Sequence, residues 1–476
     1  MPVFEQARTG HRVMAVLLTM LQMDGGKKTI ANTIVARGLD QEDWVSDFRA
    51  FGRGKWDPAA LFHGVFEAAV PLLPKEGAIV LAIDDTALPK YGQTISYTRF
   101  VHNPLCPRWI HPAIQWGLPE FHAVLIIPTR EVHRPTAITV AFEPIPTGPK
   151  KKKKKQEKLA DGTILPARKR GRPTKEETAR RLEADRIGGA QAEVKTGATW
   201  IAVKVIDRIR KWLDEAGLED RPLLVVGDGS YCNGTVICHL PERTEFIGRT
   251  REEARLCALG TKLRKGEPQY GDVLPTPKEM AIDDSIPETT GDFHYSGDVR
   301  QLKFKSITPV YWPSSTKKKP LSVLVLQPVP YGKGEKRGYN RRAYLLSTVP
   351  NPDPLPLIQA YLDRWQIEVL HRDLKSGIGL GQAQVRLPRA VERVHSGLAA
   401  MYALLVIAVL ETQGQVRTDA FGKSPKWRSN HKDWLARKRI SEGKTAPVYR
   451  PSVADITGLI RMVLGRNGSG LMRWAA

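Results

Sequence analysis

Cysteine is scarce in this chain of 476 residues: there are four, and no two of them form a CxxC motif. No Cys/His block has the spacing of a zinc site either. These absences argue against a zinc-binding module and against a disulfide-rich secreted domain. We expect a reduced compartment, and because the first residues lack a basic-then-apolar secretion pattern, the predicted location is cytoplasmic.

Acidic residues are in short supply, and long apolar runs are missing. Lysine and arginine number 73 against 50 aspartates and glutamates, which gives a formal net charge of +23. Such an excess indicates a polyanionic partner, and nucleic acid is the commonest one. The longest apolar run, 397–410, is shorter than the roughly 20 residues that a membrane-spanning helix needs, so we expect a buried helix there and no membrane partner.

Composition divides the chain into five predicted regions, as expected for a length that exceeds one domain. Residues 1–75 have helical periodicity around a glycine turn, which is typical of a helix-turn-helix-like DNA-binding region or of a plain helical bundle. Residues 129–190 are read as a basic, partly disordered linker. The predicted core consists of three pieces, residues 76–128, 191–250 and 351–415. A β-rich insertion is predicted over 251–350, and a basic C-terminal region over 416–476. The clearest predicted helices are 12–21, 29–35, 41–51, 193–216 and 389–411.

Two apolar runs of strand length each end in aspartate. Residues 78–83 precede Asp84 and Asp85, and residues 223–227 precede Asp228. Fully apolar strands are typical of a sheet that is covered on both faces, and ligands collect at strand ends of such sheets. The alternative for each aspartate taken alone is a turn-forming role.

A polar stripe follows one predicted helix. Its members are Tyr361, Arg364, Glu368 and Lys375, whose spacings of three, four and seven place all four within roughly 60° of one helix face. An apolar stripe lies beside it: Ile358, Leu362, Trp365 and Val369. Three carboxylates on two strands and a helix would suit two Mg²⁺ ions, which prefer oxygen ligands and support phosphoryl transfer. The plain alternative is an amphipathic helix with Arg364 and Glu368 as an i,i+4 pair.

These motifs resemble those of a known family. The pattern Tyr361-x2-Arg364-x3-Glu368-x6-Lys375 resembles the YREK signature of bacterial insertion-sequence transposases of the DDE type. The stretches 82–86 and 225–229 resemble that family's first and second aspartate motifs. The resemblance covers about residues 77–415. It is closest to the insertion sequence four superfamily, including its insertion sequence 701-like branch.

The resemblance implies a fold and a set of site residues. The fold would be α/β, with an RNase H-like catalytic core (a mixed sheet with helices on both faces), a β-rich insertion and an N-terminal helical domain. Asp85, Asp228 and Glu368 would be the catalytic metal ligands of two Mg²⁺ ions, for which Mn²⁺ can substitute. Asp85 is preferred to Asp84 because the family's aspartate directly precedes a threonine, and Asp84 stays open as the alternative.

The resemblance also implies a function, a DNA transposase that cuts at transposon ends and joins the freed 3′-hydroxyl to target DNA. Tyr361, Arg364 and Lys375 would hold phosphates of the transposon end. The partners would be double-stranded DNA and a second copy of the chain, which would form a homodimer in the synaptic complex. The protein would then be associated with the nucleoid. The alternatives are a non-catalytic DNA-binding remnant of a transposase and another RNase H-like nuclease.

A second motif in the linker resembles the core of an AT-hook. Arg170 and Arg172 flank a glycine and precede a proline. An extended Arg-Gly-Arg can lie along a narrow minor groove, where negative potential attracts arginine. A generic basic linker is the alternative.

Overall fold

The computed structural model of the protein describes residues 3–23, 26–103, 113–128, 135–146, 197–260, 270–295, 298–316, 319–328, 330–331, 338–339, 341–350 and 352–413. The predicted AT-hook residues Arg170 and Arg172 lie outside these described residues, as does the predicted C-terminal region 416–476.

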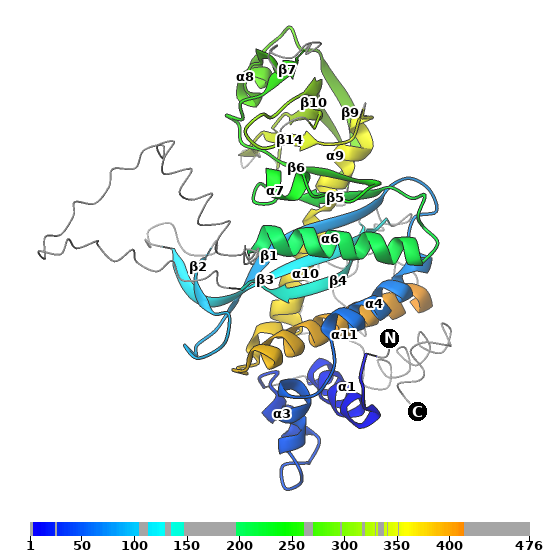
Figure 1. Ribbon diagram of the computed structural model, residues 1–476, viewed down its shortest axis with the longest axis vertical. Coiled ribbons are helices and arrows are strands. Elements are labelled where there is room, and N and C mark those ends of the chain that lie inside the picture. Colours follow the sequence, from blue (N-terminus) through cyan, green and yellow to red (C-terminus); the bar gives the residue numbers. More distant parts are fainter. Residues whose placement is uncertain are drawn as a thin grey trace, which may run out of the picture.

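One large mixed sheet runs through the molecule (Figure 1). Its strand order is β2-β3-β1-β5-β6-β14-β11-β10-β9, with β4 paired to β3. Strand β3 is antiparallel to β1 and β4, whereas β1, β5 and β6 are mutually parallel. The bounds of this half are β1 (Ile79–Pro89), β2 (Arg99–His102), β3 (Ile114–Ile127), β4 (Thr136–Pro144), β5 (Leu223–Gly227) and β6 (Thr244–Arg249). Three antiparallel strands followed by two parallel ones are consistent with the expected RNase H-like fold.

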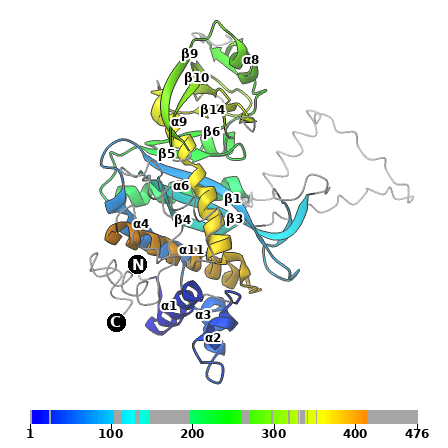
Figure 2. The ribbon, with the colours of Figure 1, turned by 180° about the vertical axis from the view of Figure 1, so that it is seen from behind.

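Helices cover both faces of this half of the sheet (Figures 1 and 2). Helix α6 (Ala198–Glu215) lies on one face and turns an apolar stripe toward it, including the buried Val205, Ile209 and Leu213. On the other face lies α10 (Trp365–Arg372), which continues from α9 (Pro354–Asp363). The shorter elements are η1 (Val70–Leu72), α7 (Gly234–Ile237), the π-helical turn η3 (Asp373–Gly377) and η4 (Leu380–Gln382).

The predicted insertion is rich in strands and extends the same sheet. Its elements are β7 (Cys257–Leu259), β8 (Tyr270–Val273), α8 (Pro277–Ile282), β9 (Glu288–Tyr295), β10 (Asp298–Val310), β11 (Leu321–Leu326), β12 (Pro330–Tyr331), β13 (Gly338–Tyr339) and β14 (Ala343–Ser347). Strand β14 pairs with β6, which joins the insertion to the core. A second apolar cluster forms beneath these strands and includes Phe293, Phe304 and Ile358. Helix α9 is therefore anchored on the insertion side, and α10 on the core side.

The structure corrects three sequence-based expectations. The linker was expected from residue 129, but Thr136–Pro144 is β4, an almost fully buried strand paired with β3. The helix expected over 41–51 begins only at Val45, after a turn. The polar-stripe helix is interrupted at Arg364 and changes to a π-helical turn at Asp373, so Lys375 does not follow the geometry of one straight helix.

Four helices precede β1: α1 (Ala7–Gln22), α2 (Ile30–Ala36), α3 (Val45–Gly52) and α4 (Pro58–Ala69). Helices α1, α3 and α4 pack on the long helix α11 (Pro388–Gln413), and α2 packs on α1 and α3; all share one apolar core with the sheet. Arg393 of α11 is buried among them and donates hydrogen bonds to the carbonyl oxygens of Phe51 and Trp56. The N-terminal helices are therefore packed firmly onto the sheet-containing core.

Helix α11 is long and apolar enough to cross a membrane by length and composition alone. However, 78% of its most apolar window is buried inside the protein. One such helix is weak support for a membrane span, because the core helix of a globular protein meets the same criterion. Its burial agrees with the expected core helix over 389–411.

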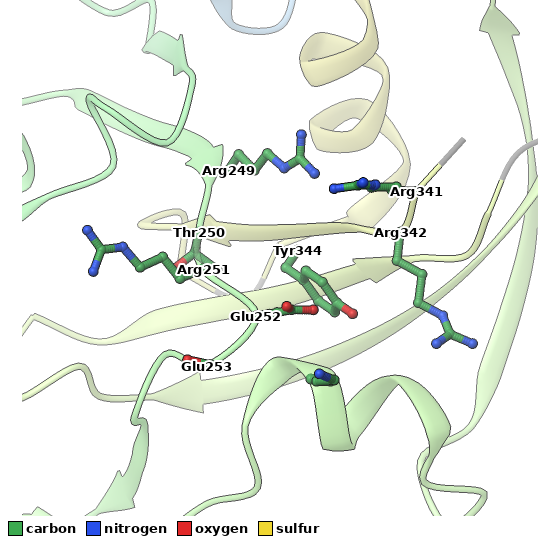
Figure 3. Close-up of a pocket in the computed structure, with 9 residues that line it drawn as sticks. Arg249, Thr250, Arg251, Glu252, Glu253, Arg341, Arg342 and Tyr344 are labelled. Atoms are coloured by element: carbon green, nitrogen blue, oxygen red, sulfur yellow. The ribbon is translucent and has the colours of Figure 1, made fainter. Parts of the chain in front are cut away.

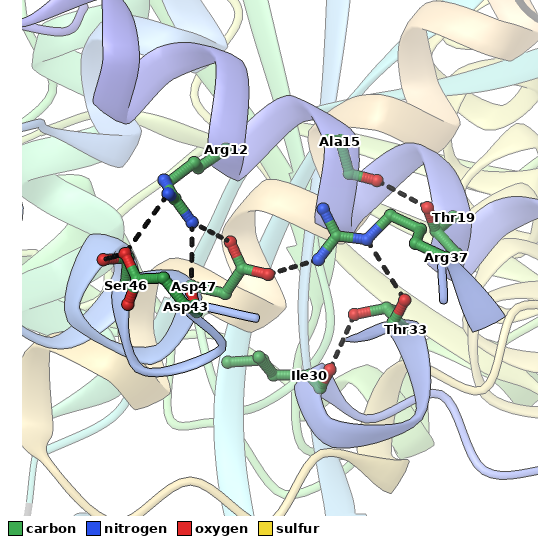
Figure 4. A network of polar contacts seen from close by, with 9 residues as sticks. All are labelled: Arg12, Ala15, Thr19, Ile30, Thr33, Arg37, Asp43, Ser46 and Asp47. Atoms are coloured by element: carbon green, nitrogen blue, oxygen red, sulfur yellow. Dashed lines mark hydrogen bonds and ion pairs between the residues drawn. The ribbon is translucent and has the colours of Figure 1, made fainter. Parts of the chain in front are cut away.

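A polar network links the first three helices (Figure 4). Asp47 is 2% exposed and forms ion pairs with Arg37 and, at 3.3 Å, with Arg12. Arg12 also reaches Asp43, whose side chain is 54% exposed, at 3.4 Å. The buried carboxylate of Asp47 therefore joins α3 to α1 and to the end of α2.

We expect Asp47→Asn to lower the free energy of unfolding by about 2 kcal/mol, because both arginines lose their buried ionic partner. Denaturant unfolding monitored by circular dichroism measures the change. Asp43→Asn is the matched control and is expected to have little effect, because its carboxylate is exposed to water. Equal effects of the two variants would show that burial of Asp47 is unimportant.

Candidate active site

Aspartates lie on two neighbouring strands, although the strand expected to end before Asp84 continues to Pro89. Asp84 and Asp85 lie within β1, and Asp228 directly follows β5. The parallel register pairs Ala82 with Val226, and the same offset two residues later brings Asp84 opposite Asp228. Adjacent strands are about 4.8 Å apart, so the sheet itself brings these carboxylates close together.

A single arginine connects the strand to the helix. Arg364, between α9 and α10, places Nη1 at 2.9 Å from Asp84 Oδ2 and Nη2 at 3.1 Å from Glu368 Oε1. Its side chain is 13% exposed, and those of Asp84 and Glu368 are 15% and 35% exposed. Asp84 and Glu368 therefore face a common point.

Asp85 points away from that point, because successive side chains of a strand alternate between faces. Its Oδ1 accepts a long hydrogen bond, at 3.4 Å, from the hydroxyl of Tyr231. Asp84 lies opposite His122 on β3, whereas Asp85 lies opposite Phe121. Only one of the two aspartates thus shares a face with Glu368.

The carboxylates repel one another. Burial raises the pKa of Asp84 to about 6, and the charges of Asp228 and Asp85 add to the rise, while Arg364 opposes it. Burial raises the pKa of Asp85 and of Glu368 as well, and Asp228 contributes to both shifts. Below about pH 6 Asp84 holds a proton. Above it, the site concentrates more negative charge than one arginine offsets, which favours a further cation.

The donor set fits a divalent cation by its chemistry. Carboxylate oxygens on three elements are the ligands that Mg²⁺ prefers. In the part of the chain that the structure describes, no three Asp, Glu, His or Cys side chains are gathered closely enough to hold one ion. The Arg364 guanidinium lies between Asp84 and Glu368 instead, and it supplies the positive charge at that position.

The rest of the predicted polar stripe lies around this point. Burial raises the pKa of the Tyr361 phenol, and the nearby cations of Arg364 and Arg249 oppose that rise. Burial lowers the pKa of Lys375, and the charge of Asp84 opposes that change. Both side chains therefore lie within electrostatic reach of the carboxylates. The expectation of a buried apolar stripe was wrong for one member, because Trp365 is 58% exposed.

Two histidines that the sequence analysis did not assign to the site lie next to each other, His122 on β3 and His371 on α10. The rings of His122 and His371 lie 5.0 Å apart, and His122 Nε2 is 3.0 Å from Thr139 Oγ1. Burial lowers the pKa of His371 to about 3, so the pair stays neutral. The contact between these histidines depends on how α10 packs against the sheet, which no local sequence pattern carries.

Lys90 at the far end of β1 fixes the segment that follows the helix. It is 2% exposed, and its Nζ donates to the carbonyl oxygens of Gly381 at 2.8 Å and Ala383 at 2.6 Å. The same nitrogen lies 3.1 Å from His395 Nε2 on α11. Burial lowers the pKa of Lys90 to about 8, while the charge of Glu120 opposes that change. Strand β1 therefore both carries the aspartates and positions the chain beyond Lys375.

A family comparison covers most of this region. A family model described as DDE superfamily endonuclease matches residues 2–319 of the chain. The matched residues include the aspartates of β1 and β5, whereas α9 and α10 with Glu368 follow the matched part. No curated protein matches the chain.

Proposed function

The chain belongs to the DDE superfamily endonuclease family, and from this premise we propose that it is a DNA transposase of the insertion-sequence type. It would cut DNA at transposon ends and join the freed 3′-hydroxyl to target DNA. The observation that carries the proposal is the pair of contacts by which Arg364 joins Asp84 of β1 to Glu368 of α10, with Asp228 after the neighbouring parallel strand β5. The family itself supports an endonuclease acting on DNA, and the joining step and the YREK branch are our extension.

Asp228, Glu368 and one aspartate of β1 would hold two Mg²⁺ ions. Bound Mg²⁺ supplies activation of an attacking oxygen and stabilisation of a leaving oxygen in phosphoryl transfer. Sequence reasoning assigned Asp85 as the strand ligand, and that assignment stays a prediction. The contacts of Arg364 favour Asp84 instead, because only Asp84 shares a cation with Glu368.

The cations and the phenol of the stripe would position DNA. Arg364 offers a planar fork that suits a phosphate, and Lys375 offers a point charge. Tyr361 keeps its proton over the physiological range, because burial raises its pKa, so its hydroxyl can donate a hydrogen bond. Arg364 already contacts both carboxylates, so phosphate binding by its fork would compete with these contacts.

Two transposon ends require two active sites, so we propose that the working unit on DNA is a homodimer. Arg170 and Arg172 would add minor-groove contacts from the linker. The homodimer and the minor-groove contacts are both proposed from the sequence, whereas plasmid cleavage tests the catalytic part of the proposal.

The test is strand cleavage of a plasmid that carries the DNA flanking the coding region at both ends. We expect nicks at the element ends that depend on Mg²⁺, are absent in EDTA and are lost in Asp228→Ala. A joined product with a second duplex would identify a transposase, whereas cleavage without joining would identify another RNase H-like nuclease. Binding without cleavage under all conditions would indicate a non-catalytic remnant.

A further inference from the structure

A pocket with a volume of about 620 Å³ lies where the core sheet meets the insertion. Its lining contains five cationic side chains and two glutamates, and none of the catalytic carboxylates. The cations are Arg249, Arg251, Lys278, Arg341 and Arg342. They come from the end of β6, the loop after it, α8 and the residues before β14.

The five cations of this pocket outnumber its two glutamates. Figure 3 shows the guanidinium groups of Arg249 and Arg341 directed toward one another. Among the described residues, none of the five cations forms an ion pair, and neither Glu252 nor Glu253 does. Like charges that face one another across a cavity favour an anion between them.

A buried hydroxyl adds a directional donor. Thr250 lines the pocket and is 7% exposed. Its Oγ1 is buried and has no hydrogen-bond partner within the described part of the chain. Buried polar atoms are nearly always satisfied, so an unpaired hydroxyl beside arginines indicates an acceptor-rich ligand such as phosphate.

The pocket is next to the proposed active site. Arg249 is the last residue of β6 and follows Gly248, which pairs with Gly227, the residue before Asp228. Adjacent strands lie about 4.8 Å apart, so the pocket begins one strand away from a catalytic aspartate. A DNA strand whose phosphate lies at the carboxylates could therefore continue into it.

We propose that this pocket binds backbone phosphates of the DNA strand that passes the catalytic carboxylates. The identity of the ligand as DNA rests on the proposed function, while the anion site rests on the pocket itself. Its volume is many times the roughly 30 Å³ that one water occupies, which leaves room for a phosphate with bridging waters.

The test is the salt dependence of DNA binding by the full chain. Fluorescence anisotropy with a 30-base-pair random-sequence duplex in EDTA separates binding from cleavage. The pocket variant is Lys278→Gln/Arg341→Gln, and the charge-matched control is Lys75→Gln/Lys204→Gln, two exposed lysines outside the pocket. We expect the pocket variant to bind about tenfold more weakly at roughly 150 mM salt, with a log–log salt slope smaller by about 1 to 2. The control should change affinity less than about threefold.

Equal affinities and slopes for the pocket variant and its control would overturn the proposal. Thermal unfolding checks that both double variants are folded. If the pocket double variant is unstable, the single variant Arg341→Gln, at an exposed position, replaces it. Pocket-dependent binding by a protein that never cleaves the plasmid would leave this inference intact and reject the proposed catalysis. If the protein cleaves the plasmid but its pocket variants bind DNA like the control, the pocket inference is rejected and the proposed catalysis is kept.

Discussion

Replacement of Glu368 by glutamine is expected to abolish strand cleavage while DNA binding persists. The amide keeps the size of the side chain but removes the charge that α10 brings to Asp84, Asp228 and Arg364. A residue that stabilises the reacting groups directly costs about 10³-fold or more in rate when its function is removed. The measurement is the initial rate of plasmid nicking at saturating Mg²⁺, beside anisotropy with the same duplex used for the pocket.

Asp363→Asn is the matched control for this substitution. Asp363 is an acid at the end of α9, it accepts a hydrogen bond from Gln359 at 2.8 Å, and burial raises its pKa to about 6. In the part of the chain that the structure describes, its side chain forms no hydrogen bond or ion pair with the side chain of Arg364 or Asp84. We expect the cleavage rate of Asp363→Asn to lie within about threefold of wild type. This corresponds to a change of roughly 0.6 kcal/mol in the activation free energy. Normal cleavage by Glu368→Gln would show that the site is wrongly assigned.

The two aspartates of β1 are expected to differ sharply when each is replaced by asparagine. Asp84→Asn should reduce nicking by about 10³-fold, and Asp85→Asn by less than about tenfold. The reason is strand alternation: Asp84 lies in register with Asp228 and shares Arg364 with Glu368, whereas Asp85 faces Tyr231. Both substitutions keep the side-chain volume, so packing changes little.

The opposite ranking would support the assignment of Asp85 made from the sequence. Thermal unfolding of both variants is needed beside the rates, because Asp84→Asn also removes a buried partner of Arg364. A rate loss with an unchanged unfolding temperature reports on the site and not on the fold. Equal losses would mean that both carboxylates take part.

Some elements of the site could be predicted because they depend on local sequence. The apolar runs that precede Asp85 and Asp228 are strands, since continuous apolar residues of this length need burial on both faces. The spacing of Arg364 and Glu368 predicted an i,i+4 contact, and the two side chains are 3.1 Å apart. Each of these features depends on residues that are close together in the sequence, so it can be predicted without the tertiary structure.

Other features could not be predicted because they join residues far apart in the chain. The strand β4 was missed, since its place in the sheet depends on pairing with β3. The contact of Arg364 with Asp84 spans 280 residues. The break after α9 follows from packing on two different apolar clusters, one under the insertion and one under the core.

The sequence by itself determined the apolar strands that carry Asp84 and precede Asp228, the basic charge and the residues that resemble a transposase signature. Only the tertiary structure decided which face each aspartate takes, which cation joins Asp84 to Glu368, and where the arginines of the pocket gather. The physical reason is that period and composition govern a single element, whereas side-chain partners depend on sheet register and on the packing of distant segments. For this chain, the register of β1 against β5 and β3 is the feature that turns a sequence motif into a geometric site.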